Sequence, residues 1–174
     1  MTTPVHSHSP APVLKPGVKA PYELRCSPVF LLKRLGMLAK ERTMEAYEAI
    51  GASPYHYSVL AVLEEGARDT QAKIADALGL DRSWLVGLLD ELEEAGLIER
   101  KRDPEDRRRH LVSLNASGKE RLAELREISK SVENELLAAL DPEQRAQLHE
   151  LLLQLAADLD PRYAPADGET TPAI

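Results

Sequence analysis

The sequence contains a single cysteine, Cys26, in 174 residues. An internal disulfide is therefore impossible, and so is a zinc site built on several thiolates. No apolar run approaches the roughly 18 residues that a membrane span needs, and the N-terminus lacks a signal peptide's apolar stretch. These absences predict a cytoplasmic protein without membrane segments, whose sulfur chemistry is limited to that of a lone thiol.

The motifs of the common enzyme classes are absent as well. The sequence has no nucleophile elbow, no glycine loop that cradles phosphate and no HExxH zinc motif. The paired acids of DELEEAG, residues 90–96, fit a solvated helix face, and His6 and His8 have no third ligand nearby. We therefore expect neither catalysis nor a metal or other cofactor.

Charge is distributed unevenly along the chain. The net charge is -7 and the pI is about 5.3, which argue against a general attraction to nucleic acid or anionic lipid. Yet 6 of the 22 Lys and Arg residues fall between positions 100 and 110, as two basic triplets around the acidic tip DPED, residues 103–106. Any binding to a polyanion must therefore come from this local patch.

Proline marks both ends of the chain. Five of the 12 prolines fall in residues 1–21, among Ser, Thr and His, and three more fall in residues 161–174. Such a composition is typical of disordered segments. We expect one folded domain at residues 22–160, mainly α-helical, between two disordered tails.

Two helices are predicted at the start of this domain. Residues 28–50 have the apolar spacing of a long amphipathic helix, which Gly51 ends. Ser53 can cap a second helix at residues 55–65, which Gly66 closes.

Two shorter helices follow with the spacing of a helix-turn-helix. Thr70 caps residues 71–78 and Asp81 caps residues 82–95, and three residues separate the two helices. The apolar side of the pair predicts an outward face that carries Arg82, Ser83, Val86 and Gly87, with Trp84 near its edge.

A β-hairpin is predicted directly after the helix-turn-helix. Residues 97–101 and 108–114 flank the turn-forming acidic tip. This order is that of a winged helix, in which hairpin cations reach phosphates and the second helix presents its N-terminal turn to the major groove. Cations on an edge hairpin can instead prevent strand pairing with other chains, but the preceding helix-turn-helix favours groove binding.

Two further helices complete the domain. Ser117 and Glu120 have the spacing of a capping box that opens a helix to about residue 140, and Asp141 starts a last helix that ends near residue 159. The apolar stripes of these helices and of residues 28–50 exceed what one small lobe can cover. We therefore expect them to be buried against a second copy of the chain.

The run TQAKIADALGLDRSWLVGLLDELEEAGLIERKRDPEDRRRHLVSLNASG, residues 70–118, resembles the multiple-antibiotic-resistance regulator (MarR) family of bacterial transcription factors. The resemblance implies a homodimer on a palindromic operator, usually a repressor that a small phenolic or other aromatic ligand releases. It places dimerisation helices at about residues 28–50 and 117–159 and a DNA-binding lobe at about residues 53–114. In the family's wing motif, matched by Asp106 and Arg108, the Arg enters the minor groove and the Asp orients it.

Two groups of residues are candidates for DNA contact. The helix-turn-helix supplies Thr70, Gln71, Arg82, Ser83, Trp84, Val86 and Gly87, and the wing supplies Arg100, Arg102, Asp106, Arg107, Arg108 and Arg109. The segment SWLVG, residues 83–87, departs from the small or polar pattern S-T-V-S-R that is common in the family, which weakens direct readout of bases. Trp84 either packs against the rest of the protein or donates its indole N–H to the DNA backbone.

An aromatic cluster marks the junction of the first two long helices, where the family's ligand crevice lies. Its members are Tyr47, Tyr55, His56 and Tyr57, and they suit an aromatic carboxylate whose acid group meets Arg25 or His110. Core and interface packing explains the same residues, so both interpretations stay open.

Two other functions also stay open. Cys26 is positioned similarly to the reactive cysteine of peroxide-sensing members of the family, although it precedes Pro28 and lies a few residues upstream of the apolar run. The apolar outer face at Trp84, Val86 and Gly87 suits a winged helix that binds protein, with the hairpin on an acidic partner.

Overall fold

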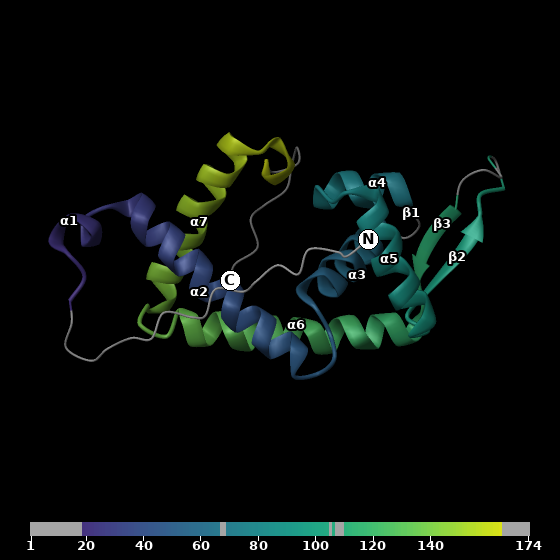
Figure 1. Ribbon diagram of the computed structural model, residues 1–174, viewed down its shortest axis with the longest axis horizontal. Helices are drawn as coiled ribbons and strands as arrows, with labels where there is room; N and C mark the ends of the chain where they lie inside the picture. The colour runs from purple at the N-terminus through teal and green to yellow at the C-terminus, as the bar shows by residue number, and fades with distance from the viewer. Residues whose placement is uncertain (1–18, 67–68, 105, 107–109, 165–174) are drawn as a thin grey trace, which may run out of the picture. The chain divides into compact units, whose positions relative to one another are not determined.

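The computed structural model describes residues 19–66, 69–104, 106 and 110–164 (Figure 1). The chain forms two compact units, Met1–Leu38 and Ala39–Ile174. Most of the two predicted tails, and residues 107–109 of the predicted wing, lie outside the described residues. Among the helices that are described, none is long and apolar enough to cross a membrane.

The first unit contains helix α1 (Tyr22–Arg25) and the beginning of α2 (Pro28–Glu48). The hydroxyl oxygen of Ser27 accepts a hydrogen bond from the backbone N–H of Phe30 at 3.3 Å, which helps to start α2. Helix α2 ends two residues before the predicted limit, in a turn that leads to Gly51 at a φ of 66°. Its first part leaves large apolar side chains exposed, namely Val29, Leu31, Leu32, Leu35 and Met37.

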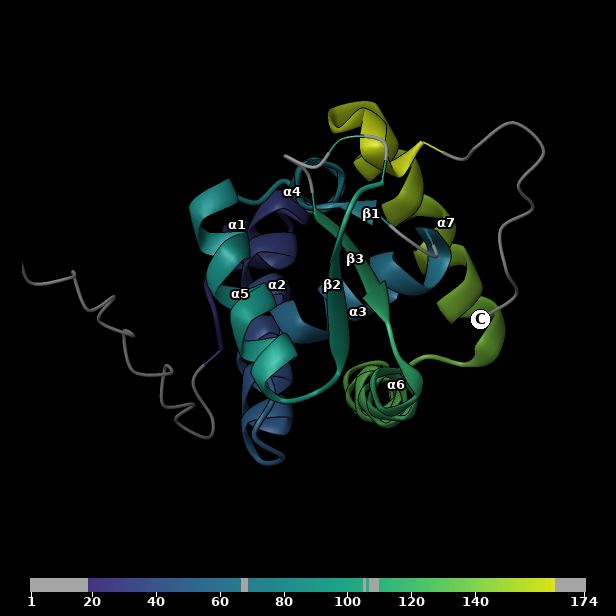
Figure 2. The ribbon, with the colours of Figure 1, turned by 90° about the vertical axis from the view of Figure 1, so that its right-hand side faces the viewer.

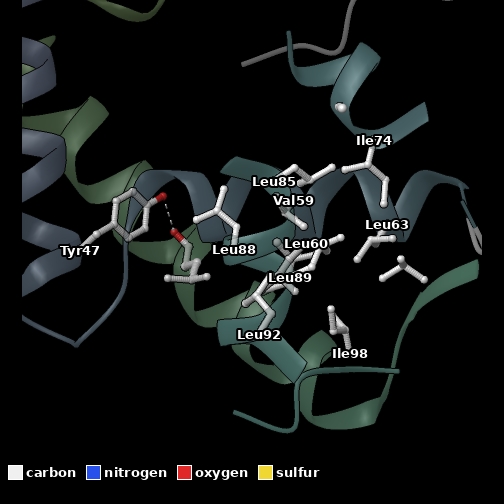
Figure 3. Packing of buried hydrophobic residues seen from close by; sticks show 14 residues of the cluster. Tyr47, Val59, Leu60, Leu63, Ile74, Leu85, Leu88, Leu89, Leu92 and Ile98 are labelled. Atoms are coloured by element: carbon white, nitrogen blue, oxygen red, sulfur yellow. Dashed lines mark hydrogen bonds between the residues drawn. The ribbon is translucent and has the colours of Figure 1, made fainter. Parts of the chain in front are cut away.

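Tyr47 anchors the end of α2 in the core of the second unit. Its side chain is 1% exposed, and its hydroxyl donates to the backbone carbonyl of Leu125 in α6 (Ala116–Leu136) at 3.2 Å (Figure 3). Its ring stacks on Tyr57 of α3 (Pro54–Gly66), with centroids 6.1 Å apart. Burial raises the pKa of the Tyr47 hydroxyl, as expected for a group that serves the core.

The helix-turn-helix is formed by α4 (Gln71–Leu78) and α5 (Arg82–Glu94), as the sequence predicts. The Thr70 side chain accepts from the backbone N–H of Lys73, and Gly79 ends α4 in the left-handed conformation at a φ of 63°. The Asp81 carboxylate accepts from the N–H groups at positions 83 and 84 and so caps α5. The predicted caps are therefore confirmed, and α5 ends one residue early.

Three strands form an antiparallel sheet in the order β1-β3-β2 (Figure 2). They are β1 (Asp69–Thr70), β2 (Ile98–Arg102) and β3 (His110–Leu114), and Arg100 pairs with Val112 in the register of β2 and β3. The predicted hairpin is confirmed within the described residues. Strand β1 is too short for an alternating pattern and was not predicted, yet it ties the segment before α4 to the wing.

The core lies where α3, α4, α5, the sheet and α6 meet (Figure 3). Apolar residues of α5 recur every three or four positions, so one side of this helix faces the core while the other faces outward. The side chains that are at most 2% exposed include Val59, Leu60, Leu63, Ile74, Leu85, Leu89, Leu92, Ile98, Val112, Leu122 and Leu125. This packing fixes the orientation of α5 against the hairpin.

The predicted start of α6 was wrong. Asn115 caps this helix, and not Ser117, because the Asn115 side-chain oxygen accepts from the N–H of Gly118 at 2.9 Å. The Asn115 amide also donates to the carbonyl of Gly96 at 2.8 Å, so the cap joins α6 to the end of α5. An Asn that bonds in both directions is favoured over a Ser at the second residue of the helix. Helix α6 ends at Leu136, four residues before the predicted limit.

The last helix, α7 (Pro142–Leu159), starts at Asp141 as predicted, and Asp141 and Gln144 form a capping box there. A 3-10 turn, η1 (Pro161–Tyr163), follows it inside the segment that was predicted to be disordered. The turn is held by Arg162, whose Nε donates to the Asp160 carboxylate at 3.0 Å. The Arg162 guanidinium also occupies the space beside Gly79 that a Cβ there would fill.

Candidate nucleic-acid interface

A groove of about 570 Å³ opens where the first turns of α4 and α5 face the beginning of β3. Its lining comes from four elements, β1, α4, α5 and β3, and consists of Thr70, Gln71, Ala72, Lys73, Arg82, Val86 and His110. Two helix N-termini point their partial positive charge toward this region, and Lys73 and Arg82 add full charges. The groove is therefore suited to bind an anion, and its lining includes Thr70, Gln71, Arg82 and Val86 of the predicted DNA contacts.

The first turn of α5 is shaped by its cap. The Asp81 carboxylate accepts from both the backbone N–H and the hydroxyl of Ser83, and these bonds hold the pKa of Asp81 below its usual range. The Ser83 proton is thus engaged within the protein. The remaining lone pairs of the Ser83 hydroxyl oxygen can still accept a hydrogen bond, for example from a donor on a base edge. Arg82 is exposed beside it.

Trp84 packs against a neighbouring helix, which is one of the two roles that the sequence left open. Its ring packs edge-on against Tyr55 in the first turn of α3, with centroids 4.3 Å apart and planes at 76°. The side chain nevertheless stays 42% exposed, and the neighbouring Val86 is 39% exposed. Tyr55, predicted as an effector residue, therefore lies against α5 and widens its exposed apolar face.

Arg100 does not lie among the solvent-exposed cations of the wing. Its Nε donates to the Glu93 carboxylate at 2.7 Å and its Nη2 to Asp90 at 2.6 Å, both on α5. The Arg100 side chain is 19% exposed, and the Glu93 carboxylate raises the pKa of the guanidinium. The same pairing lowers the pKa of Glu93. Arg100, predicted as a DNA contact, instead holds β2 against α5.

The remaining predicted wing residues divide into two groups. Arg102 is exposed at the end of β2, and Asp106 lies in the described part of the tip. Arg107, Arg108 and Arg109 lie outside the described residues. Lys101, which is also exposed, forms an ion pair with Glu99 on its own strand at 2.7 Å.

The predicted effector residues do not gather in one pocket. Tyr47 and Tyr57 stack in or beside the core, Tyr55 packs on Trp84, and His110 lines the groove described above. Arg25 belongs to the first unit, where its Nε donates to the carbonyl of Ala20 at 3.1 Å. His56 pairs with Glu91 of α5 at 2.9 Å.

His56 lines a second cleft, of about 380 Å³. The floor is apolar and the rim is charged, and the lining comprises Gly51, Ala52, His56, Leu60, Glu91, Leu92, Ala95, Leu97, Arg121 and Leu125. Arg121 donates to the carbonyl of Ile50 at 2.7 Å, which places its guanidinium at the rim. Sequence reasoning missed Arg121, although its position one helical turn before the inward-facing Leu125 was a signal for it.

Cys26 is exposed at the end of α1. Within the described residues, no group of three or more His, Cys, Asp or Glu side chains is arranged to hold a metal ion.

Comparison with known proteins finds similarity to transcriptional regulators. Residues 50–109 match the sequence model of the MarR family. A putative transcriptional regulatory protein for the hcr operon of Thauera aromatica is 32% identical over 105 residues, which cover 60% of this chain and 63% of that protein. The transcriptional regulator HosA of Escherichia coli O111:H- is 32% identical over 99 residues, which cover 57% of this chain and 70% of HosA. The chain thus spans less than two thirds of the Thauera protein.

Solved structures show the same similarity. The transcriptional repressor CouR bound to a 23-mer DNA duplex is 31% identical with a TM-score of 0.70, and the match covers 78% of this chain and 96% of CouR. CouR from Rhodococcus jostii RHA1 bound to p-coumaroyl-CoA is 30% identical with a TM-score of 0.64, over 76% of this chain and 94% of that one. These matches confirm the predicted winged-helix fold.

Proposed function

The chain belongs to the MarR family of transcriptional regulators, and from that premise we propose that it is a homodimeric repressor of a palindromic operator that a small aromatic ligand releases. The groove between α4, α5 and β3 is the observation that carries the proposal. It presents two helix N-termini, Lys73 and Arg82 on a protein whose net charge is -7. A polyanion is attracted there and repelled elsewhere.

The first turn of α5 enters the major groove in this proposal. Arg82 and Ser83 read base edges, while Val86 and the Trp84 ring contact thymine methyls and sugars. Phosphates lie over the N-terminus of α4, where Thr70 and Gln71 stand. The wing follows the adjacent minor groove with Arg102 and the basic residues 107–109. Because Ser83 and the apolar positions offer few bidentate donors, the shape of the DNA grooves contributes a large part of the specificity.

A gel-shift titration tests the DNA contacts. Arg108→Ala is expected to weaken binding to many sequences alike and to reduce the salt dependence by about 0.9 log units per log unit of salt for each phosphate that is no longer neutralised. Arg82→Ala is expected to change the preference among sequences, because one bidentate base contact discriminates by about 1–3 kcal/mol. Lys130→Ala, which removes a charge from an exposed position on α6, serves as the control.

The outcome separates two functions of a winged helix. A protein-binding module would be indifferent to random duplex at low salt in every variant. Unchanged affinity and salt slope in Arg108→Ala, with wild-type binding intact, would remove the wing from the DNA interface.

A second copy of the chain is the proposed partner of α7. In one chain this helix leaves Leu151, Leu152, Leu155 and Leu159 exposed, with exposed fractions between 41% and 82%. The first part of α2 separately exposes an apolar face of its own. Burying apolar surface stabilises association by about 25 cal/mol per Å². The loss of translational, rotational and side-chain freedom then offsets part of this gain. A two-fold dimer then places two reading helices one turn of DNA apart.

Leu155→Glu tests this dimer. The Leu155 side chain is 52% exposed in one chain, so the folded monomer should tolerate a charge that the interface cannot. We expect the mass measured by sedimentation to fall from two chains to one, and operator affinity to fall at least about tenfold because a monomer engages only one half-site. Gln154→Glu adds the same charge at the neighbouring position and should stay dimeric. A dimeric Leu155→Glu protein would contradict the assignment of this face.

The cleft lined by His56 and Arg121 is the proposed effector site. Its apolar floor suits an aromatic ring, and the guanidinium at its rim suits a carboxylate or thioester carbonyl. The cleft includes Glu91 and Leu92 of α5, so an occupant contacts the reading helix itself. An aromatic carboxylate and p-coumaroyl-CoA, the ligand of CouR, are the first compounds to add to the gel-shift assay. Continued DNA binding at saturating amounts of both would reject this effector class and leave the DNA contacts standing.

A further inference from the structure

His110 lies in the DNA-facing groove, away from the cleft where a ligand is proposed. It is the first residue of β3, pairs with Arg102 of β2 and is exposed. Side chains two apart on a strand share a face, so His110 lies on the same face of the sheet as the buried Val112. That face is turned toward α4 and α5, which is why the imidazole lines the groove beside Arg82.

The charged groups on the elements around this imidazole are of both signs, and those that line the groove itself, among the described residues, are the cations Lys73 and Arg82. Helix α4 contributes Lys73, α5 contributes Arg82, and Arg102 stands directly across on β2. The acidic residues of the adjoining segments are Asp69 of β1, Asp81 at the start of α5, and Asp103 and Asp106 of the hairpin tip. The Asp81 carboxylate is taken up by its bonds to the first turn of α5. A proton on the imidazole therefore adds a positive charge to a groove whose described lining already includes Lys73 and Arg82.

Histidine is the side chain whose charge changes between about pH 5 and pH 8. An anion within hydrogen-bonding distance of an imidazole favours its protonated form. A DNA phosphate that enters the groove is such an anion, and a protonated imidazole can donate to a phosphate oxygen. Binding of the phosphate and binding of the proton are thus coupled, and each raises the affinity for the other.

We propose that His110 contacts the DNA backbone and takes up a proton from solvent when the complex forms. This inference rests on the proposed DNA binding and adds a proton-linked contact to it. Because the complex holds more protons than the free partners, affinity rises as pH falls and decreases as pH rises. The limit for one linked proton is about tenfold in affinity per pH unit for each protomer bound.

Binding isotherms of the full-length protein test this inference. Affinity for one duplex is measured at constant ionic strength at several values between about pH 6 and pH 8. Calorimetric titration in two buffers of different ionisation enthalpy then counts the protons taken up. His110→Gln is expected to bind more weakly at the acidic end and to lose most of the pH dependence. His110→Arg keeps the positive charge, so it should bind tightly with an equally flat profile.

A matched histidine provides the control. His149→Gln makes the same chemical change on α7, outside the groove, and should retain the wild-type slope and proton count. Equal pH slopes in the wild type, His110→Gln and His110→Arg would overturn the proton-linked contact. Absence of duplex binding at low salt by all four proteins would instead overturn the proposed function. Should His110→Gln fold poorly, a pH-dependent His110→Arg protein would still refute the inference.

Discussion

Gly118→Ala is expected to destabilise the protein by about 2 kcal/mol or more, although glycine to alanine in a helix usually stabilises by up to about 1 kcal/mol. Gly118 lies in the first turn of α6, and an added Cβ would collide with the backbone carbonyl oxygen of Leu97. It would also come within 2.8 Å of a methyl group of Leu114. Overpacking therefore outweighs the gain in helix propensity.

The backbone at Leu97 has little freedom to yield. Its N–H donates to the carbonyl of Leu92 at 3.0 Å, and its carbonyl accepts from the N–H of Asn115 at 3.3 Å. Moving it away from α6 would disturb the end of α5 and the start of β2 together. The cost is measured by urea denaturation of the variant against the wild type.

Gly87→Ala is the matched control for this prediction. Gly87 lies in the interior of α5, and nothing lies within 4 Å of the position that its Cβ would take. There the ordinary preference should hold, and the variant should gain about 0.5–1 kcal/mol in the free energy of unfolding. A Gly118→Ala protein as stable as the wild type would contradict the close approach of α6 to the wing.

Arg100→Met is expected to reduce both stability and DNA affinity. The substitution keeps much of the side-chain volume but leaves the Asp90 and Glu93 carboxylates facing each other without their shared cation. Since both carboxylates are partly exposed, water screens the loss, and we expect about 1–2 kcal/mol in the free energy of unfolding. DNA affinity should fall about tenfold or more, because the wing is no longer held at a fixed angle to α5.

The pH dependence of this effect has a definite sign. The Arg100 guanidinium lowers the pKa of Glu93 in the folded protein. A carboxyl group of this kind stabilises the fold above its unfolded pKa, and that contribution is lost as pH falls through its folded pKa. The stability difference between the wild type and Arg100→Met should therefore be fully present at neutral pH and shrink below about pH 4.

Arg100→Lys supplies the control for charge alone. Lysine keeps the positive charge but cannot bridge two carboxylates with a planar fork. We expect stability between that of the wild type and Arg100→Met, with part of the DNA affinity restored. Equal stability of all three proteins at neutral pH would show that the contact between β2 and α5 does not depend on this ion cluster.

The order of elements was predictable because its signals are local. Thr70, Gly79 and Asp81 mark helix ends through their own backbone and side-chain preferences, and each acts as expected. The start of α6 was harder, because Asn115 and Ser117 are both competent caps. The contact of the Asn115 amide with Gly96 decides between them, and that contact depends on how the chain folds back.

The candidate site was predictable in part. The outward face of α5 follows from helical periodicity, and the structure exposes it as expected. From side-chain chemistry alone, Arg100 was assigned to DNA contact and His110 to the effector pocket. The face of the strand on which each residue lies was not considered. Alternation with the buried Ile98 and Val112 already put both on the inner face of the hairpin. The sequence could not show which aromatic residues line a pocket and which pack in the core, because ring packing such as that of Tyr55 on Trp84 is a tertiary contact.

Strand β1 has a consequence for the proposed release of DNA by a small ligand. It joins the segment just before α4 to β3, while Arg100 joins β2 to α5, so the hairpin is tied to both helices of the helix-turn-helix. A braced lobe moves as a rigid body more easily than it changes shape. In a dimer, an inducer would therefore alter the separation of two unchanged lobes. Induction should shift which half-site spacings are accepted and leave the preferred half-site sequence as it was.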